Sequence, residues 1–214
     1  MEILQVEKLK KSFGHISVFD NIDFICNSGD IVGLIGKNGS GKTSLIKTMC
    51  GLIKQDSGRI IINGKELKDK YSVNIKIGVL LDSSRSLYWR MTALQNFIYF
   101  SALKEIFGIR VKENAYILFN MFDLWEFKDA LVETFSFGMK QKLSLICTLA
   151  NDPTILLLDE PTSGMDSKSK EIFESIILKI SKQNKIIIFS SHDKELTDKI
   201  CTKLVEIDKK NDNS

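Results

Sequence analysis

A glycine-rich stretch near the beginning of the chain constrains its fold more than any other feature. It follows an apolar run at 31–35, precedes a segment of helical character at 44–49, and consists of Gly36, Lys37, Asn38, Gly39, Ser40, Gly41, Lys42 and Thr43. Glycine permits backbone conformations that turn several N–H groups toward one anion, and a helix beginning near Lys42 adds the positive end of its dipole. The stretch therefore predicts a phosphate site between a buried strand and a helix, rather than a glycine-rich turn with a chance lysine.

The two residues that end this stretch have the chemistry that nucleotide phosphates require. The Lys42 ammonium neutralises charge on β- and γ-phosphates, and the Thr43 hydroxyl is a ligand for a Mg²⁺ ion that bridges the same phosphates. Both residue types stand at the spacing that such a site needs. We therefore expect this loop to bind phosphate groups together with Mg²⁺.

The size and charge of the chain limit the classes of protein to consider. Its 214 residues are enough for one large α/β domain with an inserted subdomain, and two independent domains are not expected. The net charge of +3, from 30 basic and 27 acidic side chains, is slight and dispersed. Because this charge gives no argument for nucleic acid or for an anionic membrane surface, no nucleic-acid partner is expected.

The apolar segments and the cysteines add expectations about location. Runs such as 155–158 and 186–189 are far shorter than the ~20 residues that cross a bilayer. The N-terminal residues lack the basic start and apolar core of a signal peptide, so we expect the chain to stay in the cytoplasm. No paired metal-ligand spacing links the cysteines, and we expect reduced, mostly buried thiols rather than a zinc site at Cys26, Cys50, Cys147 and Cys201.

The first third of the chain has the pattern of strands joined by tight turns. Strands are predicted at 3–9, 17–26, 57–62 and 76–81, with turns at Gly14-His15 and Asn63-Gly64 and a helix cap at Gly51. Phe13 lies beside the first turn. A single aromatic residue is more often part of a core than a platform for a purine ring, so these residues alone favour a buried Phe13.

Between 83 and about 151 the pattern changes to helical periodicity with many aromatic residues, which predicts a helical insertion. Because an aromatic stripe at helical spacing usually belongs to the core, most of these rings are expected to be buried. Tyr88 and Trp89 lie near a loop instead and are the expected exceptions. Exposed aromatic side chains of this kind mark a partner surface.

Two later strands end in polar residues. The apolar run 155–158 precedes Asp159, Glu160 and a proline, and the run 186–189 leads to His192. Ligands of open α/β sheets bind beyond the carboxyl ends of the strands. We therefore expect Asp159 to hold Mg²⁺, Glu160 to polarise an attacking water and His192 to contact the γ-phosphate, with ordinary strand-end residues as the alternative. A helix is predicted at 167–182, and the tail 209–214 is expected to be disordered.

Together these motifs resemble the ATP-binding subunit of an ABC transporter over essentially the whole chain. The stretch 135–141 is similar to the signature loop of that family, although Phe137 replaces its first glycine and Met139 its glutamine. Both replacements occur in export-type members. Ser136 and Gly138 open a helix that continues to 149, and a helix N-terminus is a natural anion site.

The resemblance implies a fold and a set of site residues. The fold is an α/β P-loop NTPase, an ABC-type ATPase domain spanning 1–214 with an antiparallel β subdomain and an inserted helical subdomain. Asp159 is matched to the Mg²⁺ ligand, Glu160 to the catalytic carboxylate and His192 to the switch histidine. The residues matched to ATP binding are Phe13, Gly36, Lys37, Asn38, Gly39, Ser40, Gly41, Lys42, Thr43, Ser44, Ser136, Gly138, Met139 and Asp166.

Phe13 and Asp82 differ from the other matched residues. Phe13 is matched to an aromatic residue that stacks on adenine, which reverses the expectation of a buried ring. Asp82 stands where most of the family has a glutamine that reaches Mg²⁺ and senses the membrane partner. The stretch that follows, 84–94, is similar to exporter ATPases for drugs, antibiotics or bacteriocins.

The resemblance also implies partners. Two copies of such a chain hold two ATP molecules between them and drive a separate transmembrane permease from the cytoplasmic face of the membrane. Soluble ABC-type ATPases that act on ribosomes or DNA are the alternative, but the ribosomal ones carry two cassettes and the DNA-maintenance ones a long coiled coil. This chain has one phosphate loop and no sustained heptads between Lys42 and Asp159. A kinase-like phosphotransferase would leave the signature loop unexplained.

Overall fold

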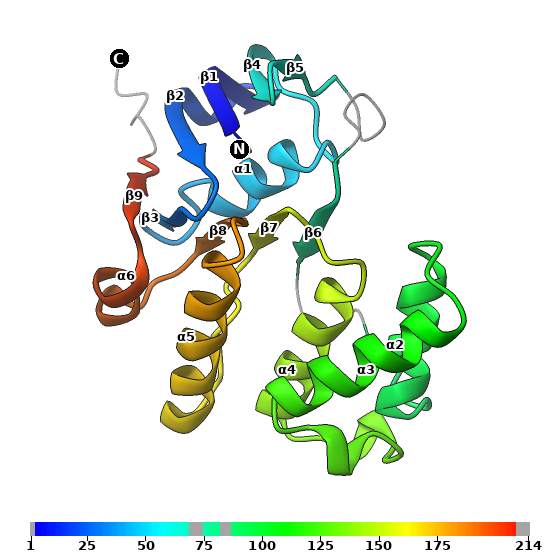
Figure 1. The fold of residues 1–214 in the computed structure, drawn as a ribbon. Helices are drawn as coiled ribbons and strands as arrows, with labels where there is room; N and C mark the ends of the chain where they lie inside the picture. The colour runs from blue at the N-terminus through cyan, green and yellow to red at the C-terminus, as the bar shows by residue number, and fades with distance from the viewer. Residues whose placement is uncertain (1–2, 69–74, 82–86, 209–214) are drawn as a thin grey trace.

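Two β-sheets form the framework of the protein in a computed structural model that describes residues 3–68, 75–81 and 87–208 (Figure 1). The larger sheet is parallel and five-stranded, in the order β6 (Ile77–Leu80), β7 (Ile155–Leu158), β8 (Ile186–Ser190), β3 (Ile31–Ile35) and β9 (Lys203–Glu206). β8 therefore lies between β7 and β3, although these strands are far apart in the sequence. The carboxyl ends of all three strands meet at one edge of the sheet.

The smaller sheet is antiparallel, in the order β2 (Ile16–Asn27), β1 (Ile3–Phe13), β4 (Ser57–Ile62) and β5 (Lys65–Glu66). The predicted turns lie between its strands. Asn63 and Gly64 both have positive φ, at 52° and 76°, as a tight hairpin turn with two left-handed residues requires. The strands predicted at 3–9 and 17–26 are longer than expected, because pairing between them continues as far as Phe13 and Ile16.

Helix α1 (Lys42–Met49) lies between the two sheets (Figure 1). Its buried residues Leu45, Ile46 and Met49 pack in one cluster with the antiparallel sheet and with one face of the parallel sheet. The helix ends as predicted at Gly51, which has φ 75°. The N–H groups of Gly51 and Leu52 donate to the carbonyls of Thr48 and Lys47, at 3.0 and 2.9 Å, so this end is a Schellman motif.

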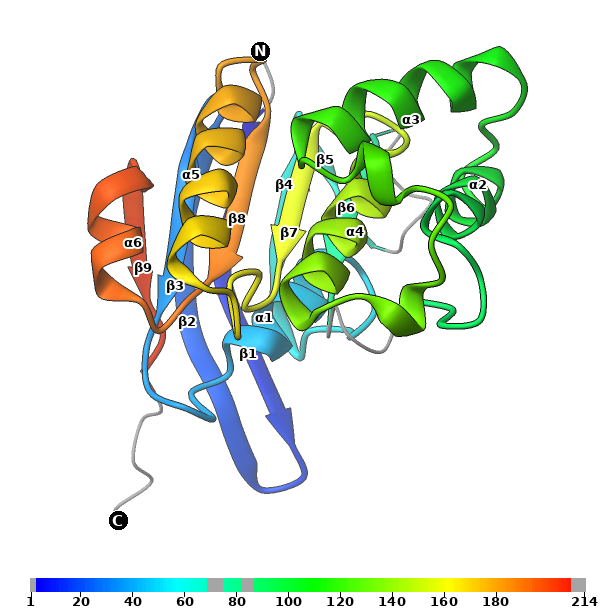
Figure 2. The same ribbon diagram turned by 90° about the horizontal axis from the view of Figure 1, so that it is seen from below.

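The other face of the parallel sheet is covered by helices. These are α5 (Ser167–Ser181), α6 (Lys194–Ile200) and the insertion, which contains α2 (Ala93–Ala102), α3 (Ile109–Met121), the 3₁₀ turns η1 (Trp125–Phe127) and η2 (Val132–Thr134), and α4 (Phe137–Leu149). Figure 2 shows α5 alongside β8 and the insertion to one side of the sheet. Ile155 and Leu157 pack toward α1, whereas Leu156 and Leu158 pack toward the helical layer. This alternation explains why β7 is apolar throughout.

The expectation that most aromatic rings of the insertion belong to the core holds only narrowly. Phe97, Phe119 and Phe122 are buried, and Phe100 and Trp125 pack partly buried against the same core. Tyr88 and Trp89 are exposed, as predicted, but Tyr99, Phe107, Tyr116 and Phe127 are exposed as well. Exposed rings also pack edge-to-face on each other, such as Tyr88 on Tyr99 with centroids 4.8 Å apart. The insertion is a thin layer of helices, so its helical period places rings on both sides.

The predicted fold class is confirmed: an α/β protein with an antiparallel β subdomain and an inserted helical subdomain. Within the described ranges, none of the helices combines the length and the apolar character needed to cross a membrane. Cys26 and Cys147 are buried and the other two cysteines half-buried, all four as free thiols. Residues 82–86 and the tail 209–214 lie outside the described residues.

Candidate nucleotide-binding site

The glycine-rich loop connects β3 to α1, as the sequence predicts, and two of its glycines are required by close approach of other chain segments. Gly36 has φ 147°, and a Cβ there would lie 2.3 Å from the carbonyl oxygen of Ile207. Gly41 has φ 107°, and its Cβ would lie 2.9 Å from the carbonyl oxygen of Val18. Both positions combine a left-handed backbone with no room for a side chain, so only glycine fits.

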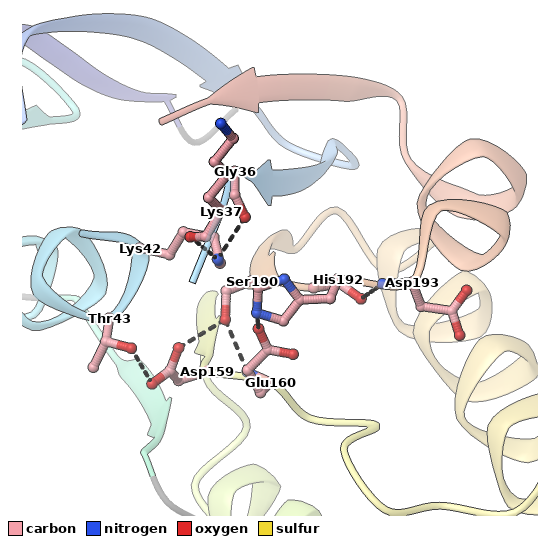
Figure 3. A network of polar contacts seen from close by, with 10 residues as sticks. Gly36, Lys37, Lys42, Thr43, Asp159, Glu160, Ser190, His192 and Asp193 are labelled. Carbon is pink, nitrogen blue, oxygen red and sulfur yellow. Dashed lines mark hydrogen bonds and ion pairs between the residues drawn. The ribbon is translucent and has the colours of Figure 1, made fainter. Parts of the chain in front are cut away.

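The loop offers several donors to an anion. Since the first intrahelical bond of α1 joins Leu45 N–H to Gly41, at 2.8 Å, the preceding N–H groups of this helix have no intrahelical partner. Lys42 is 6% exposed, and its Nζ donates to the carbonyls of Gly36 and Lys37 at 2.9 and 3.1 Å (Figure 3). The buried hydroxyl of Ser40 has no hydrogen-bond partner. A cradle of this kind fits a phosphate group.

Asp159 lies directly beside the loop. Its Oδ2 accepts a hydrogen bond from Thr43 Oγ1 at 2.8 Å, and its Oδ1 accepts one from Ser190 Oγ at 2.7 Å (Figure 3). A hydroxyl and a carboxylate in contact are hard oxygen donors of the type that Mg²⁺ takes, together with water and phosphate oxygens. The residues present at Thr43 and Asp159 thus fit a Mg²⁺ ion.

Glu160 is held both at its backbone and at its side chain. It has φ 46°, an uncommon conformation for a residue with a side chain, and its N–H donates to Ser190 Oγ at 2.8 Å. Its Oε1 lies 2.9 Å from Nε2 of His192 (Figure 3). Burial raises the pKa of the Glu160 carboxyl, while nearby His192 and Lys42 oppose that rise.

A hollow of about 440 Å³ joins these groups into one site. It is lined by Phe13, Ile16, Val18, Asn38, Gly39, Ser40, Gly41, Lys42, Thr43, Ser44, Glu160 and His192. Phe13 lies at the edge of this hollow and is 51% exposed, so the expectation of a buried ring is wrong. The strand pairing that continues to the Gly14-His15 turn carries the ring beyond the sheet, on the same side as the phosphate loop.

The remaining predicted site residues lie elsewhere. Ser136, Gly138, Met139 and Asp166 do not line this hollow. Ser136 is the N-cap of α4, where its Oγ accepts from Met139 N–H at 3.2 Å. Asp166 is the N-cap of α5 and accepts from Ser169 N–H at 2.7 Å, which lowers the pKa of its carboxyl. Both helix beginnings follow the N-cap preferences of serine and aspartate.

The signature stretch and the loop at 163–166 contact each other within the chain. The buried side chain of Gln141 donates from Nε2 to the carbonyl of Ser163 at 3.1 Å. Gly164, with φ 70°, lies against the Phe137 ring so closely that a Cβ on it would be 2.6 Å from Cε1. Phe137, which departs from the family pattern, therefore packs on the backbone of the neighbouring loop.

Comparison with known proteins agrees with this geometry. The family model described as ABC transporter matches residues 19–163, which is more than half of the chain. This chain belongs to the ABC transporter family. As an ABC transporter ATP-binding domain it binds ATP.

Relatives and a solved structure support the assignment. The domain is 34% identical over 188 residues to the ABC transporter ATP-binding protein NatA of Bacillus subtilis, covering 87% of this chain and 76% of that protein. It is 30% identical over 207 residues to the linearmycin resistance ATP-binding protein LnrL of Bacillus subtilis, covering 96% and 66%. A crystal structure of a nucleotide-free ATP-binding cassette from an ABC transporter has the same fold, with TM-score 0.86 at 21% identity, covering 98% of this chain and 88% of that one.

Two positions of this ABC domain show the limits of the sequence analysis. Asp82, matched to the metal-contacting glutamine of the family, lies outside the described residues. Ser190 was missed, although it contacts both acidic residues. The signal that identifies it is the alternation along β8: Ile186 and Ile188 pack toward α1, so the next residue of that row must face α1 as well.

Proposed function

We propose that this ABC transporter domain hydrolyses ATP and that hydrolysis powers export, through a separate transmembrane permease, of a drug, antibiotic, peptide or similar substrate. The observation that carries the proposal is the Glu160 carboxyl, which faces the phosphate hollow with Nε2 of His192 at 2.9 Å. Export is supported by the likeness to LnrL, whose name refers to linearmycin resistance, and by the exporter-like stretch 84–94.

The roles of the residues follow from their positions. Lys42 and the N–H groups at the start of α1 bind the phosphates, and the exposed ring of Phe13 stacks on the adenine. Thr43 and Asp159 hold Mg²⁺, which neutralises phosphate charge when bound. Glu160 accepts a proton from the attacking water, a task that suits a carboxyl whose pKa is raised by burial. His192 holds this carboxyl in place and contacts the γ-phosphate.

A second ATP-binding chain completes the site. Ser136, Gly138 and Met139 form the beginning of α4, which is a second helix N-terminus suited to an anion. Because these residues lie outside the phosphate hollow of their own chain, they are free to serve the ATP of a partner. We place Asp166 and the 163–166 loop between the two sites of such a homodimer.

The permease docks on the helical insertion, which places the domain on the cytoplasmic face of the membrane. Tyr88 and Trp89 are 47% and 50% exposed. The Tyr88 ring packs edge-to-face on Tyr99 with centroids 4.8 Å apart, and Nζ of Lys140 lies 4.4 Å from the Trp89 ring. These contacts hold both rings at the surface without burying them, as a binding surface requires.

Hydrolysis is tested with the purified chain. We expect ATPase activity that requires Mg²⁺ and that is lost in Lys42→Ala, because the β- and γ-phosphates then lack their cation. Lys65→Ala is the matched control, since Lys65 is exposed on β5 and does not line the phosphate hollow. A wild-type chain that binds ATP with Mg²⁺ and releases no phosphate would contradict the proposal.

Docking is tested by co-purification from membranes that contain a candidate permease, a multispanning membrane protein from a neighbouring reading frame. Replacing Tyr88 and Trp89 together with alanine should reduce co-purification and leave the melting temperature of the isolated domain within a few degrees. Phe107→Ala is the control, because Phe107 is 65% exposed in the same insertion. Retained docking together with a lower melting temperature would assign both rings to stability instead.

A further inference from the structure

Ser190 lies at the centre of the site, at the end of the strand that separates the phosphate loop from the acidic residues. It is the last residue of β8, which pairs with β3 on one side and β7 on the other. Its backbone is in register with Leu34 of β3, two residues before the glycine-rich loop begins. The side chain is 0% exposed, so its hydroxyl must be satisfied within the protein.

The direction of this side chain is set by the strand. Ile186 and Ile188 belong to the cluster around α1, and Ser190 continues their row. On the neighbouring strand Ile155 and Leu157 belong to the same cluster, and Asp159 continues that row. Ser190 and Asp159 are therefore polar ends of two adjacent apolar rows, and both face the beginning of α1.

The Ser190 hydroxyl joins the two acidic residues. It donates its proton to Asp159 Oδ1 at 2.7 Å and accepts the N–H of Glu160 at 2.8 Å (Figure 3). Thr43 takes the other oxygen of the Asp159 carboxylate, which leaves its orientation determined at both ends. The bond to Glu160 N–H holds a residue whose φ of 46° is unfavourable for a side chain.

We propose that Ser190 is a positioning residue that orients the Asp159 carboxylate toward the metal and fixes the backbone of Glu160 in the conformation that directs its carboxyl to His192. The proposal rests on the proposed ATPase function and adds a residue to it. Without the hydroxyl, Asp159 Oδ1 loses its donor and the N–H of Glu160 loses its acceptor. The Asp159 carboxylate and the Glu160 backbone can then rotate independently. The two acidic side chains are no longer held in a fixed position relative to each other.

The next residue provides a matched control. Ser191 is also buried, at 3% exposure, and its hydroxyl accepts from Asp193 N–H at 3.0 Å. It thus makes a hydrogen bond of the same kind one position later, but to the cap of α6 rather than to the acidic residues. Removing either hydroxyl deletes one buried oxygen, so a difference between the two variants reports the contact with Asp159 and Glu160.

The experiment compares Ser190→Ala with Ser191→Ala. For Ser190→Ala we expect kcat to fall about 10- to 50-fold, KM for ATP to stay within about twofold, and the Mg²⁺ concentration for half-maximal activity to rise several-fold, because one oriented catalytic carboxyl typically contributes ~10²–10⁴-fold. A second measurement needs no turnover: the factor by which Mg²⁺ tightens binding of a fluorescent ATP analogue should fall in Ser190→Ala, with unchanged affinity in a chelator. Ser191→Ala should match wild type in each of these quantities.

Two isosteric variants separate the effect of the Ser190 hydroxyl from the effect of side-chain size. Ser190→Thr and Ser190→Val differ only in that the first keeps a hydroxyl where the second has a methyl group. The threonine variant should exceed the valine variant at least fivefold in kcat and should keep more of the Mg²⁺ effect on binding. This comparison still decides the matter if both variants, or Ser190→Ala, have lower melting temperatures.

Three results would overturn the role of Ser190: wild-type kcat and Mg²⁺ dependence in Ser190→Ala, equal losses in Ser191→Ala, or equal values for the threonine and valine variants. Failure of the ATPase proposal has a different signature, because the wild-type chain itself then hydrolyses no ATP. The Mg²⁺ effect on analogue binding decides the role of Ser190 toward Asp159 in that case as well.

Discussion

The phosphate loop and the signature stretch are both helix beginnings prepared for an anion, yet they differ in how much of a site they form within one chain. At the start of α1 the loop is joined to Asp159, and through Ser190 to Glu160, so that donors and carboxylates form one network. At the start of α4, Ser136 caps its own helix and lines no part of the phosphate hollow.

This difference follows from topology. The residues of the first site come from strands that are neighbours in one sheet, so each strand end lies near the next. The signature stretch belongs to the helical insertion, which is attached to one side of that sheet (Figure 2). Its contact with the rest of the site is the 163–166 loop, through Gln141 and Phe137. The first half is complete in one chain, whereas the second lies outside that hollow, and for this reason we propose that it acts on the ATP of another chain.

The largest expected effect concerns the site around the phosphate loop, which is complete within one chain. Glu160→Gln should retain ATP binding and lose about 10²–10⁴-fold in kcat, because the amide cannot accept the proton of the attacking water. Steady-state phosphate release and binding of a fluorescent ATP analogue measure the two quantities. Glu206→Gln, at the exposed end of β9, is the control. A kcat within a factor of about two of wild type would remove Glu160 from the reaction.

The second prediction tests the comparison of the phosphate loop with the signature stretch. It mixes two variant chains, each of which has one of these two segments disabled. Lys42→Ala disables the phosphate loop and Ser136→Arg the signature stretch, so neither variant alone can form an intact composite site. A mixture contains one intact site per heterodimer and should show an ATP-dependent dimer in size-exclusion chromatography, together with partial ATPase activity.

The control for this mixture pairs Lys42→Ala with a chain carrying both substitutions, because every composite site then lacks Lys42. It should remain monomeric and inactive. If the first mixture forms no heterodimer under conditions where wild type dimerises, the signature stretch does not act on a partner's ATP.

The third prediction concerns the contact between the signature stretch and the 163–166 loop. Gly164→Ala places a Cβ 2.6 Å from the Phe137 ring at a φ of 70°, and should lower the unfolding free energy by about 1–3 kcal/mol. Gly64→Ala is the control for backbone strain alone, since Gly64 has φ 76° and an open space around its Cβ position. Urea unfolding measures both.

Adding Phe137→Ala to Gly164→Ala should recover the steric part of this loss and leave a deficit close to that of Gly64→Ala. Equal unfolding free energies for Gly164→Ala and Gly64→Ala would show that the ring moves aside freely. In that event the two segments are not held together by Phe137.

The last expected effect, which is limited to alkaline pH, lies at the C-terminal end of α4. Lys104 donates to the carbonyls of Cys147 and Thr148, both at 2.9 Å, and burial lowers its pKa to about 8. Between pH 8 and about 10.5 the unfolded chain keeps a proton that the folded chain has lost, so this group raises stability as pH rises, by at most about 1.4 kcal/mol per pH unit. Below about pH 8 the lysine is protonated in both states, so its effect on stability no longer changes with pH.

Lys104→Met should therefore differ from wild type increasingly between pH 8 and 10 in urea unfolding, whereas its difference at pH 6 and pH 7 should be constant. Lys112→Met, on an exposed position of α3, provides the comparison at matched charge. A difference between Lys104→Met and wild type that stays constant from pH 6 to pH 10 would contradict the lowered pKa.

Much of this molecule could be predicted from sequence because its patterns are local. The phosphate loop, the apolar rows of β7 and β8 and the N-caps at Ser136 and Asp166 depend on neighbours in the chain. The exposure of the Tyr116 and Phe127 rings could not be predicted from the sequence, because it depends on whether another layer covers the insertion. The link from Ser190 to Asp159 requires knowing that β8 lies next to β7, which no periodicity contains.

The two carbonyls that hold Lys42 have a consequence for how fast and how selectively ATP is captured. With its ammonium bonded to the carbonyls of Gly36 and Lys37, Lys42 holds the loop in shape through contacts within the chain. When a triphosphate binds, the Lys42 ammonium exchanges these carbonyl acceptors for phosphate oxygens, and little of the loop backbone has to become ordered. Binding therefore avoids the entropy cost of folding a loop, which is about 1–2 kcal/mol per residue. Capture should then be fast and nearly independent of loop motion, and discrimination between ATP and ADP should lie in how long each stays bound.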